Sequence, residues 1–124
     1  MTIDWTTLRN DVGPYPPAAY EFVQEGLRHT VETLRDAEPD LPDAGRHVSG
    51  QELCVGLRDY ALREYGALAR TVLRSWNVHR TEDFGRIVFG LVDAGMLRKT
   101  DEDSIEDFQG VYDFDEAFTP VNMA

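Results

Sequence analysis

The sequence predicts a mainly α-helical single domain spanning residues 1–124, with a winged-helix-like unit in its C-terminal part. Three observations favour this class. Apolar residues recur at steps of three and four in segments bounded by helix-capping residues. After Gly95 the apolar spacing changes to one that suits two short strands. A chain of 124 residues, of which 42% are hydrophobic, is also long enough and apolar enough to form one core.

A first helix is predicted over residues 18–37, inside an N-terminal helical extension of residues 1–48. Pro16 and Pro17 stand just before it, where a helix tolerates proline because its first N–H groups have no acceptor to lose. Its apolar stripe consists of Tyr20, Val23, Leu27, Val31 and Leu34. The Glu38-Pro39 pair predicts its end.

A second helix, over residues 50–65, has the clearest start signal in the chain. Ser49 followed three residues later by Glu52 forms a capping box, in which each residue satisfies a backbone donor of the other. Gly66 then provides a residue that adopts positive φ without strain, which predicts the end of the helix.

Two further helices are expected over residues 67–76 and 81–95. Asn77 suits the left-handed conformation that ends the first of them, and Thr81 is predicted as the N-cap of the second. At 100° per residue, one side of the last helix collects the apolar residues Phe84, Ile87, Val88, Leu91 and Val92.

Residues 97–100 and 111–114 are predicted to pair as a short β-hairpin, joined by an acidic loop over residues 101–110. Three helices followed by a hairpin are typical of a winged helix, which predicts a winged-helix-like core over residues 49–118. The alternative is a plain helical domain with a disordered acidic tail.

The side of helix 81–95 opposite the core stripe is the preferred candidate for a functional surface. A large aromatic residue lies there between two glycines that allow another backbone to approach closely. Interface centres favour aromatic residues over charged ones, so this face predicts contact with a protein partner or a second copy in a homodimer. The alternative is that helix 18–37 covers the face within the same chain. The predicted partner-binding residues are Phe89, Arg86, Gly85 and Gly90.

Charge argues against nucleic acid as the partner. The chain carries a formal net charge of -11, which repels nucleic acid and favours a basic partner. Residues 61–100 nevertheless sum to +3, so a winged-helix transcriptional regulator is the alternative function. Its nucleic-acid contacts would be Arg74, Arg80, Arg86, Arg98 and Lys99.

No residue pattern predicts catalysis, a cofactor or a metal site. Cys54 lies where a buried helix residue is expected, and nucleophile, phosphate-loop and dinucleotide motifs are missing from the sequence. The three histidines fall in different segments, and the acidic loop lacks the ligand spacing of a calcium loop. The single cysteine, an N-terminus without signal-peptide features and short apolar runs predict a cytoplasmic protein outside the membrane.

Five separated segments resemble a small family of bacterial proteins found mainly in planctomycetes and verrucomicrobia. The segments are YPPAAYEFV (15–23), HVSGQEL (47–53), ARTVL (69–73), TEDFGRIVF (81–89) and GVYDFDEAF (110–118). The family has no assigned activity, ligand or catalytic residue, so the resemblance implies no mechanism. The function predicted from the residues themselves is a non-catalytic interaction module.

Overall fold

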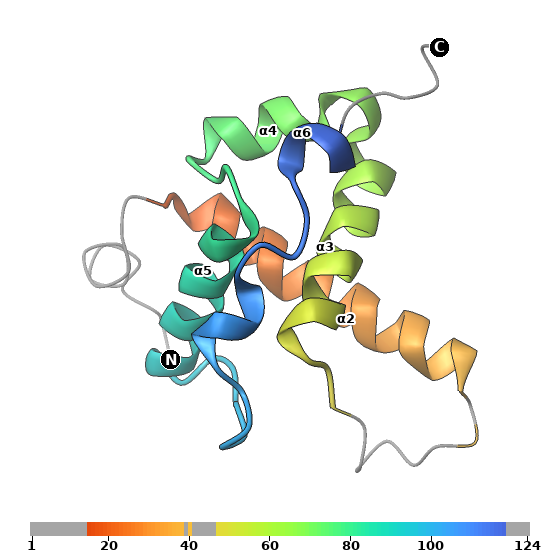
Figure 1. The fold of residues 1–124 in the computed structure, drawn as a ribbon, viewed down its shortest axis with the longest axis vertical. Helices are drawn as coiled ribbons and strands as arrows, with labels where there is room; N and C mark the ends of the chain where they lie inside the picture. Colours follow the sequence, from red (N-terminus) through yellow and green to blue (C-terminus); the bar gives the residue numbers. More distant parts are fainter. Residues whose placement is uncertain (1–14, 39, 41–46, 119–124) are drawn as a thin grey trace.

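A computed structural model describes residues 15–38, 40 and 47–118, and these residues form a helical fold (Figure 1). No β-strand occurs among them. The elements in chain order are α2 (Pro17–Ala37), α3 (Gly50–Tyr65), the 3₁₀ turn η2 (Gly66–Leu68), α4 (Ala69–Ser75), α5 (Thr81–Asp93), the 3₁₀ turn η3 (Ile105–Phe108) and α6 (Phe114–Ala117). The mainly α-helical class is therefore confirmed.

The α2 helix agrees with the predicted helix over residues 18–37 and packs against α3 at unusually close range. Pro17 is its first residue, as the prolines predicted. A Cβ atom on Gly26 would lie 2.2 Å from Leu57 Cδ2, and one on Gly56 would lie 1.8 Å from Thr30 Oγ1. Only glycine at these two positions permits this approach, so α2 and α3 form one tightly packed pair.

The predicted capping box of α3 is present. The Glu52 amide donates to Ser49 Oγ at 3.1 Å, and the Ser49 amide donates to Glu52 Oε1 at 3.0 Å. The helix ends at Tyr65 before Gly66, which has a φ of 53°. The predicted helix 67–76 is shorter than expected, because η2 comes first and α4 covers residues 69–75. Asn77 has a φ of 63°, as predicted.

The start of α5 corrects the role predicted for Thr81. Arg80 occupies the N-cap position, and the carboxylate of Asp83 accepts from the amides of His79 and Arg80 at 2.8 and 3.3 Å. Thr81 is fully buried and turns its hydroxyl to the C-terminal segment instead. It donates to the Phe108 carbonyl at 2.6 Å and accepts from the Val111 amide at 3.2 Å. The helix ends at Asp93, two residues earlier than predicted.

The predicted winged-helix hairpin is wrong: neither residues 97–100 nor residues 111–114 form a strand. Ser104 begins η3 by accepting from the Glu106 amide, and Asp113 begins α6 by accepting from the Asp115 amide at 2.8 Å. These side chains satisfy backbone donors that a strand ladder would otherwise need. The buried residues of the segment are Phe108 in η3, Phe114 in α6 and Phe118 directly after α6, so its apolar side chains are buried from short helical turns.

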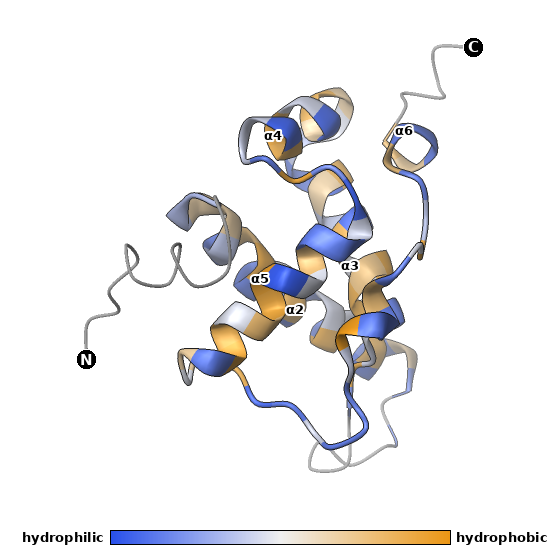
Figure 2. Cartoon of the chain, turned by 60° about the vertical axis from the view of Figure 1, so that its left-hand side comes forward, coloured by the Kyte–Doolittle hydropathy of each residue, from blue (hydrophilic) through white to orange (hydrophobic). Residues whose placement is uncertain are grey.

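One hydrophobic cluster joins α2 to the elements that follow it. Helices α2 and α5 pack against each other, and Figure 2 shows hydrophobic residues on both. Tyr20 and Val23 of α2 are fully buried in the same cluster as Leu57 of α3 and Phe84 of α5. The region predicted as an N-terminal extension thus supplies part of the central core.

Candidate functional site

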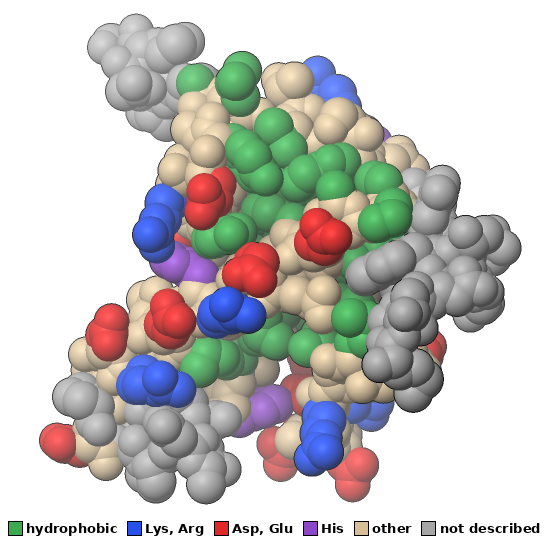
Figure 3. All heavy atoms as spheres, turned by 180° about the vertical axis from the view of Figure 1, so that it is seen from behind, with side chains coloured by type: hydrophobic (Ala, Val, Ile, Leu, Met, Phe, Trp, Pro, Cys, Tyr) green, Lys and Arg blue, Asp and Glu red, His purple; other side chains and the backbone are tan. Residues whose placement is uncertain are grey.

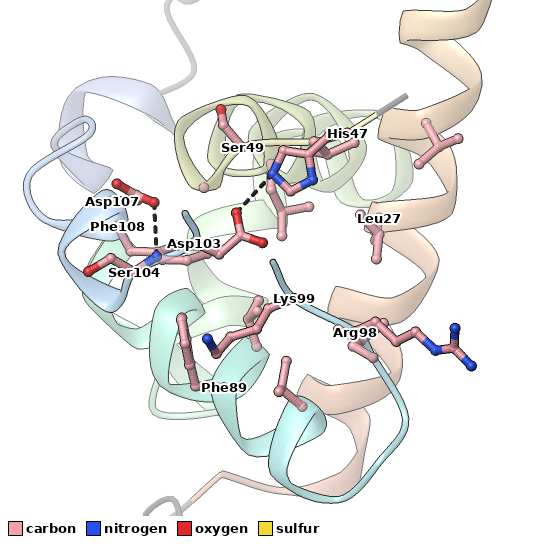
Figure 4. Close-up of a pocket in the computed structure, with 17 residues that line it drawn as sticks. Leu27, His47, Ser49, Phe89, Arg98, Lys99, Asp103, Ser104, Asp107 and Phe108 are labelled. Carbon is pink, nitrogen blue, oxygen red and sulfur yellow. Dashed lines mark hydrogen bonds and ion pairs between the residues drawn. The ribbon is translucent and has the colours of Figure 1, made fainter. Parts of the chain in front are cut away.

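A pocket of about 210 Å³ opens where α2, the start of α3, α5 and the segment after α5 meet (Figure 4). Its apolar wall comes from all four parts of the chain. The apolar residues are Leu27 and Val31 from α2, Val48 and Leu53 around the start of α3, Val88, Phe89 and Val92 from α5, and Leu97 and Phe108 from the last segment. Its polar residues are His47, Ser49, Arg98, Lys99, Asp103, Ser104 and Asp107.

The aromatic end of the pocket is built on two glycines. Phe108 is seated so closely that a Cβ on Gly85 of α5 would lie 2.9 Å from Phe108 Cβ. A Cβ on Gly50 of α3 would lie 3.1 Å from the ring atom Cε2 of Phe108. Phe89 meets the Phe108 ring edge to face, with ring centroids 6.4 Å apart. The wall at this end is therefore held by direct packing between α3, α5 and η3.

A hydrogen bond between two side chains closes one side of the rim. His47 Nε2 lies 2.8 Å from Asp103 Oδ1, and this contact joins the segment before α3 to the segment after α5. Asp103 Oδ2 also accepts from the Thr100 amide at 2.8 Å. Burial alone would raise the pKa of Asp103, but the hydrogen bonds from Thr100 and His47 outweigh it and lower that pKa below its usual value. Asp103 is thus an ionised anchor for the loop.

Two cations lie at the mouth of the pocket. Arg98 and Lys99 are exposed and form no ion pair with any residue that the structure describes. In Figure 4 the Lys99 side chain lies above Phe89, whereas the Arg98 guanidinium points away from the cavity. The mouth therefore offers charge around an apolar interior, the arrangement found at the anchor sites of protein interfaces.

The four residues predicted to bind a partner do not form one open face. Phe89 is half-buried and lines the pocket, whereas Gly85 and Gly90 are buried. The close approach expected at Gly85 is made by Phe108 of the same chain. Arg86 is exposed, and its Nη1 donates to Asp83 at 3.1 Å. The alternative prediction was that helix 18–37 covers this face within the same chain, but η3 supplies the contact at Gly85.

The five basic residues of the nucleic-acid alternative fall into separate places. Arg80 and Arg86 belong to the start and first half of α5, and Arg74 lies on α4. Arg98 and Lys99 follow the C-terminal end of α5, so a helix of 13 residues, about 20 Å long, separates them from Arg80. Nucleic-acid binding stays a prediction, and its predicted contacts do not form one continuous strip.

A second polar contact, which joins the starts of α2 and α5, was not foreseen. The hydroxyl of Tyr15 donates to Asp83 Oδ1 at 2.5 Å, and both residues are buried. Burial, followed by this hydrogen bond to a carboxylate, raises the pKa of Tyr15 well above its ordinary value. Asp83 thus caps α5 and anchors Tyr15 at the same time. No local sequence signal indicates a contact between residues 68 positions apart.

Several pocket residues were also missed. His47 and Asp103 are 56 positions apart, so no spacing rule connects them. Leu27 and Val31 were placed in the apolar stripe of the first helix, but that stripe gives no sign that its far end borders a cavity. Cys54 is buried as predicted, and burial raises its pKa to about 12.

Within the described ranges, no group of three or more His, Cys, Asp or Glu side chains is placed to hold a metal ion. No helix in that part of the chain is both long enough and apolar enough to span a bilayer. Comparison of the chain with family models, with curated proteins and with solved structures finds no match. The resemblance in the five sequence segments therefore stays a prediction.

Proposed function

We propose that the chain is a non-catalytic interaction module that binds a protein partner by taking one apolar side chain of that partner into the pocket. The observation that carries this proposal is an open cavity whose wall is apolar and whose rim is polar. Interfaces gain most of their binding energy from a few anchor residues in such pockets, and the polar rim excludes water around them. The partner is another protein or a second copy of the chain.

The size of the cavity supports a side chain over a cofactor. Its volume of about 210 Å³ is below the range of about 300–1,000 Å³ that is typical of sites for drug-sized ligands. Full burial of one Leu or Phe side chain supplies about 1.5–3 kcal/mol, which suits an anchor within a larger contact. Arg98 and Lys99 at the mouth would orient the partner through its polar groups.

The pocket borders a segment that lacks regular structure over most of its length. Residues 94–104 connect α5 to η3, and the His47–Asp103 hydrogen bond holds this connection to the segment before α3. A loop held on a rigid helical frame is a common location for binding residues. This arrangement favours recognition of a partner at the loop side of α5.

A matched pair of variants tests the proposal. The wild-type chain is used to select binders from a random peptide library, and the affinity of the selected peptides is measured by calorimetry. Val92 lines the pocket, whereas Val55 is exposed on α3 and does not line it. We expect a consensus with one apolar position, binding weakened by about tenfold or more in Val92→Phe, and no change in Val55→Phe.

Three results would contradict the proposal. These are selected peptides without a shared apolar position, equal affinities for the wild type and Val92→Phe, and an equal loss of affinity in both variants. Sedimentation velocity over a range of protein concentrations identifies the partner class. Dimerisation that Val92→Phe abolishes would make a second copy the partner, whereas a monomer at all concentrations would assign the pocket to another protein.

A further inference from the structure

A second apolar surface lies on the back of the molecule as it is drawn in Figure 1, the face that Figure 3 shows. We call it the aromatic patch and define it by Tyr60, Tyr65 and Trp76, whose rings surround that of Phe22, together with Leu68, which lies three residues after Tyr65 in η2. The Phe22 ring centroid is 5.5 Å from those of Tyr60 and Trp76 and 6.3 Å from that of Tyr65. None of these five residues lines the pocket, so the patch is a separate feature.

The patch is partly open to solvent. Leu68 is 63% exposed, the largest value among the exposed large apolar residues of the described chain. Tyr60, Tyr65 and Trp76 are half-buried, so each leaves part of its ring uncovered. Figure 3 shows hydrophobic side chains gathered on this face, with acidic side chains along one border. Contiguous apolar surface with a polar border is typical of sites of protein contact.

The acidic border is close to the aromatic rings. Burial raises the pKa of Tyr60 first, and the negative charges of Glu64 and Glu25 raise it further. Glu21 lies one turn before Glu25 on α2 and next to Phe22. Glu21 and Glu64 form no ion pair with the described residues. These three carboxylates therefore give the patch a negative edge.

Two nearby cations are already engaged. Arg28 lies 3.6 Å from Glu25 as an i,i+3 pair, and Arg63 Nη1 lies 3.5 Å from His29 Nδ1. The His29 ring in turn packs on Tyr60, with ring centroids 5.5 Å apart. Arg28 thus pairs with Glu25, whereas Arg63 keeps its charge because its contact is with an imidazole. Glu21 and Glu64 are the carboxylates of this edge that remain for a partner. The net charge of -11 adds a long-range attraction for a positively charged partner.

We propose that the aromatic patch binds an amphipathic segment of a partner protein that carries Lys or Arg beside apolar side chains. Its apolar side chains would cover Leu68 and the exposed parts of Tyr65 and Trp76, and its cations would face Glu21 and Glu64. Lysine and arginine also bind the faces of Trp and Tyr rings, so the rings and the carboxylates favour the same ligand. Nucleic acid and anionic lipid are negatively charged, as this edge is, so the edge repels them.

The first test removes the charge of the border and leaves the rings in place. The probe is a fluorescein-labelled amphipathic peptide of alternating Leu and Lys turns, titrated with the full chain and followed by anisotropy. The border variant combines Glu21→Gln and Glu64→Gln. The control removes the same charge from exposed positions elsewhere, by Asp101→Asn and Glu102→Gln. We expect about three- to tenfold weaker binding in the border variant, the effect of two exposed ion pairs, and little change in the control.

The second test removes the apolar contact. Leu68→Ser is compared with Val55→Ser, which changes another exposed apolar residue that lies outside the patch. Binding should weaken in Leu68→Ser and stay unchanged in Val55→Ser. Circular dichroism tests whether every variant keeps the helical fold. Because the substituted positions are exposed, we expect the variants to stay folded.

Several outcomes would overturn the inference. An equal loss of peptide affinity in the border and control variants would show that the peptide responds to the total charge of the protein. Failure of the wild type to bind the peptide would rule out this kind of partner. Dimerisation that Leu68→Ser abolishes would make a second copy the occupant. The variants of the pocket, Val92→Phe above all, should bind this probe normally, so failure here leaves the proposed function of the pocket standing.

Discussion

Replacement of Thr81 by valine tests how the C-terminal segment is held. The Thr81 hydroxyl donates to the Phe108 carbonyl at 2.6 Å and accepts from the Val111 amide at 3.2 Å. Valine has nearly the same shape, so Thr81→Val keeps the packing and removes both hydrogen bonds. Phe108 and Val111 belong to the segment that the sequence had predicted as part of a hairpin.

The expected loss of stability in Thr81→Val follows from the two backbone groups that lose a hydrogen-bond partner, the Phe108 carbonyl and the Val111 amide. Thr81 is fully buried and Phe108 is 4% exposed, so water cannot easily replace the lost bonds. The buried Phe108 carbonyl should cost about 1–3 kcal/mol and the half-buried Val111 amide about 1 kcal/mol, a loss of about 2–4 kcal/mol in all. Since domains of this kind are stable by about 5–15 kcal/mol, the protein should stay folded. If the unfolding free energy falls by about 2 kcal/mol per M of urea, the urea midpoint should fall by about 1–2 M.

The assay is urea unfolding followed by circular dichroism, with two control variants at the same position. Thr81→Ser keeps the hydroxyl and should lose about 1 kcal/mol through the missing methyl group. Thr81→Asn distinguishes the observed role from an N-cap role, because asparagine is among the best N-cap residues. We expect Thr81→Asn to be at least as destabilising as Thr81→Val. A neutral or stabilising Thr81→Asn, or a Thr81→Val within 0.5 kcal/mol of the wild type, would refute the observed role.

Three further results are expected. Tyr112→Phe removes a 2.6 Å hydrogen bond from the hydroxyl to the Cys54 carbonyl and should cost about 1–2 kcal/mol in urea unfolding; an unchanged midpoint would contradict this contact. Cys54, whose pKa burial raises to about 12, should resist iodoacetamide at pH 8 until the protein unfolds, and rapid labelling of the folded protein would count against its burial. The folded-state pKa of Asp103 is lowered, so its contribution to stability is present above its unfolded pKa and is lost as pH falls through the folded one. As pH falls below about 4, stability of the wild type should therefore decrease more steeply than that of Asp103→Asn, and parallel pH profiles would exclude this contribution.

The sequence predicts those elements that depend on local signals. The boundaries of α3 follow from Ser49, Glu52 and Gly66, because caps and positive-φ residues act within a few positions. The start of α2 follows from Pro17 for the same reason. Asn77 ends the next helix where expected. In each case the residue that determines the boundary is next to the boundary.

The C-terminal segment could not be predicted in this way, because its conformation depends on distant partners. Phe108 is placed by Gly50 and Gly85, which are far from it in the sequence. Thr81 carries a good N-cap side chain, yet its hydroxyl satisfies a carbonyl 27 positions away. Without these contacts, the apolar residues near positions 97 and 111 fit two short strands as well as they fit the observed conformation. Tertiary packing selects the observed helical turns over the predicted hairpin.

The candidate site was predicted in one part. The aromatic residue Phe89 was singled out because it lies opposite the core stripe of its helix, and it lines the pocket. The cavity itself depends on the gap between α2, α5 and the segment after α5, which no periodicity describes. His47 and Asp103 close the rim from separate parts of the chain, so their pairing required the folded structure.

Methyl-resolved NMR of the full chain is the most direct test of the claim that the pocket binds a protein partner. The labelled protein is titrated with the peptide selected from the library, and the Leu and Val methyl resonances are followed. The account predicts saturating shifts for Leu53, Val88 and Val92, which line the pocket, and none for the exposed Val55. Shifts confined to Val55 or Leu68, with the three pocket methyls unchanged, would contradict it.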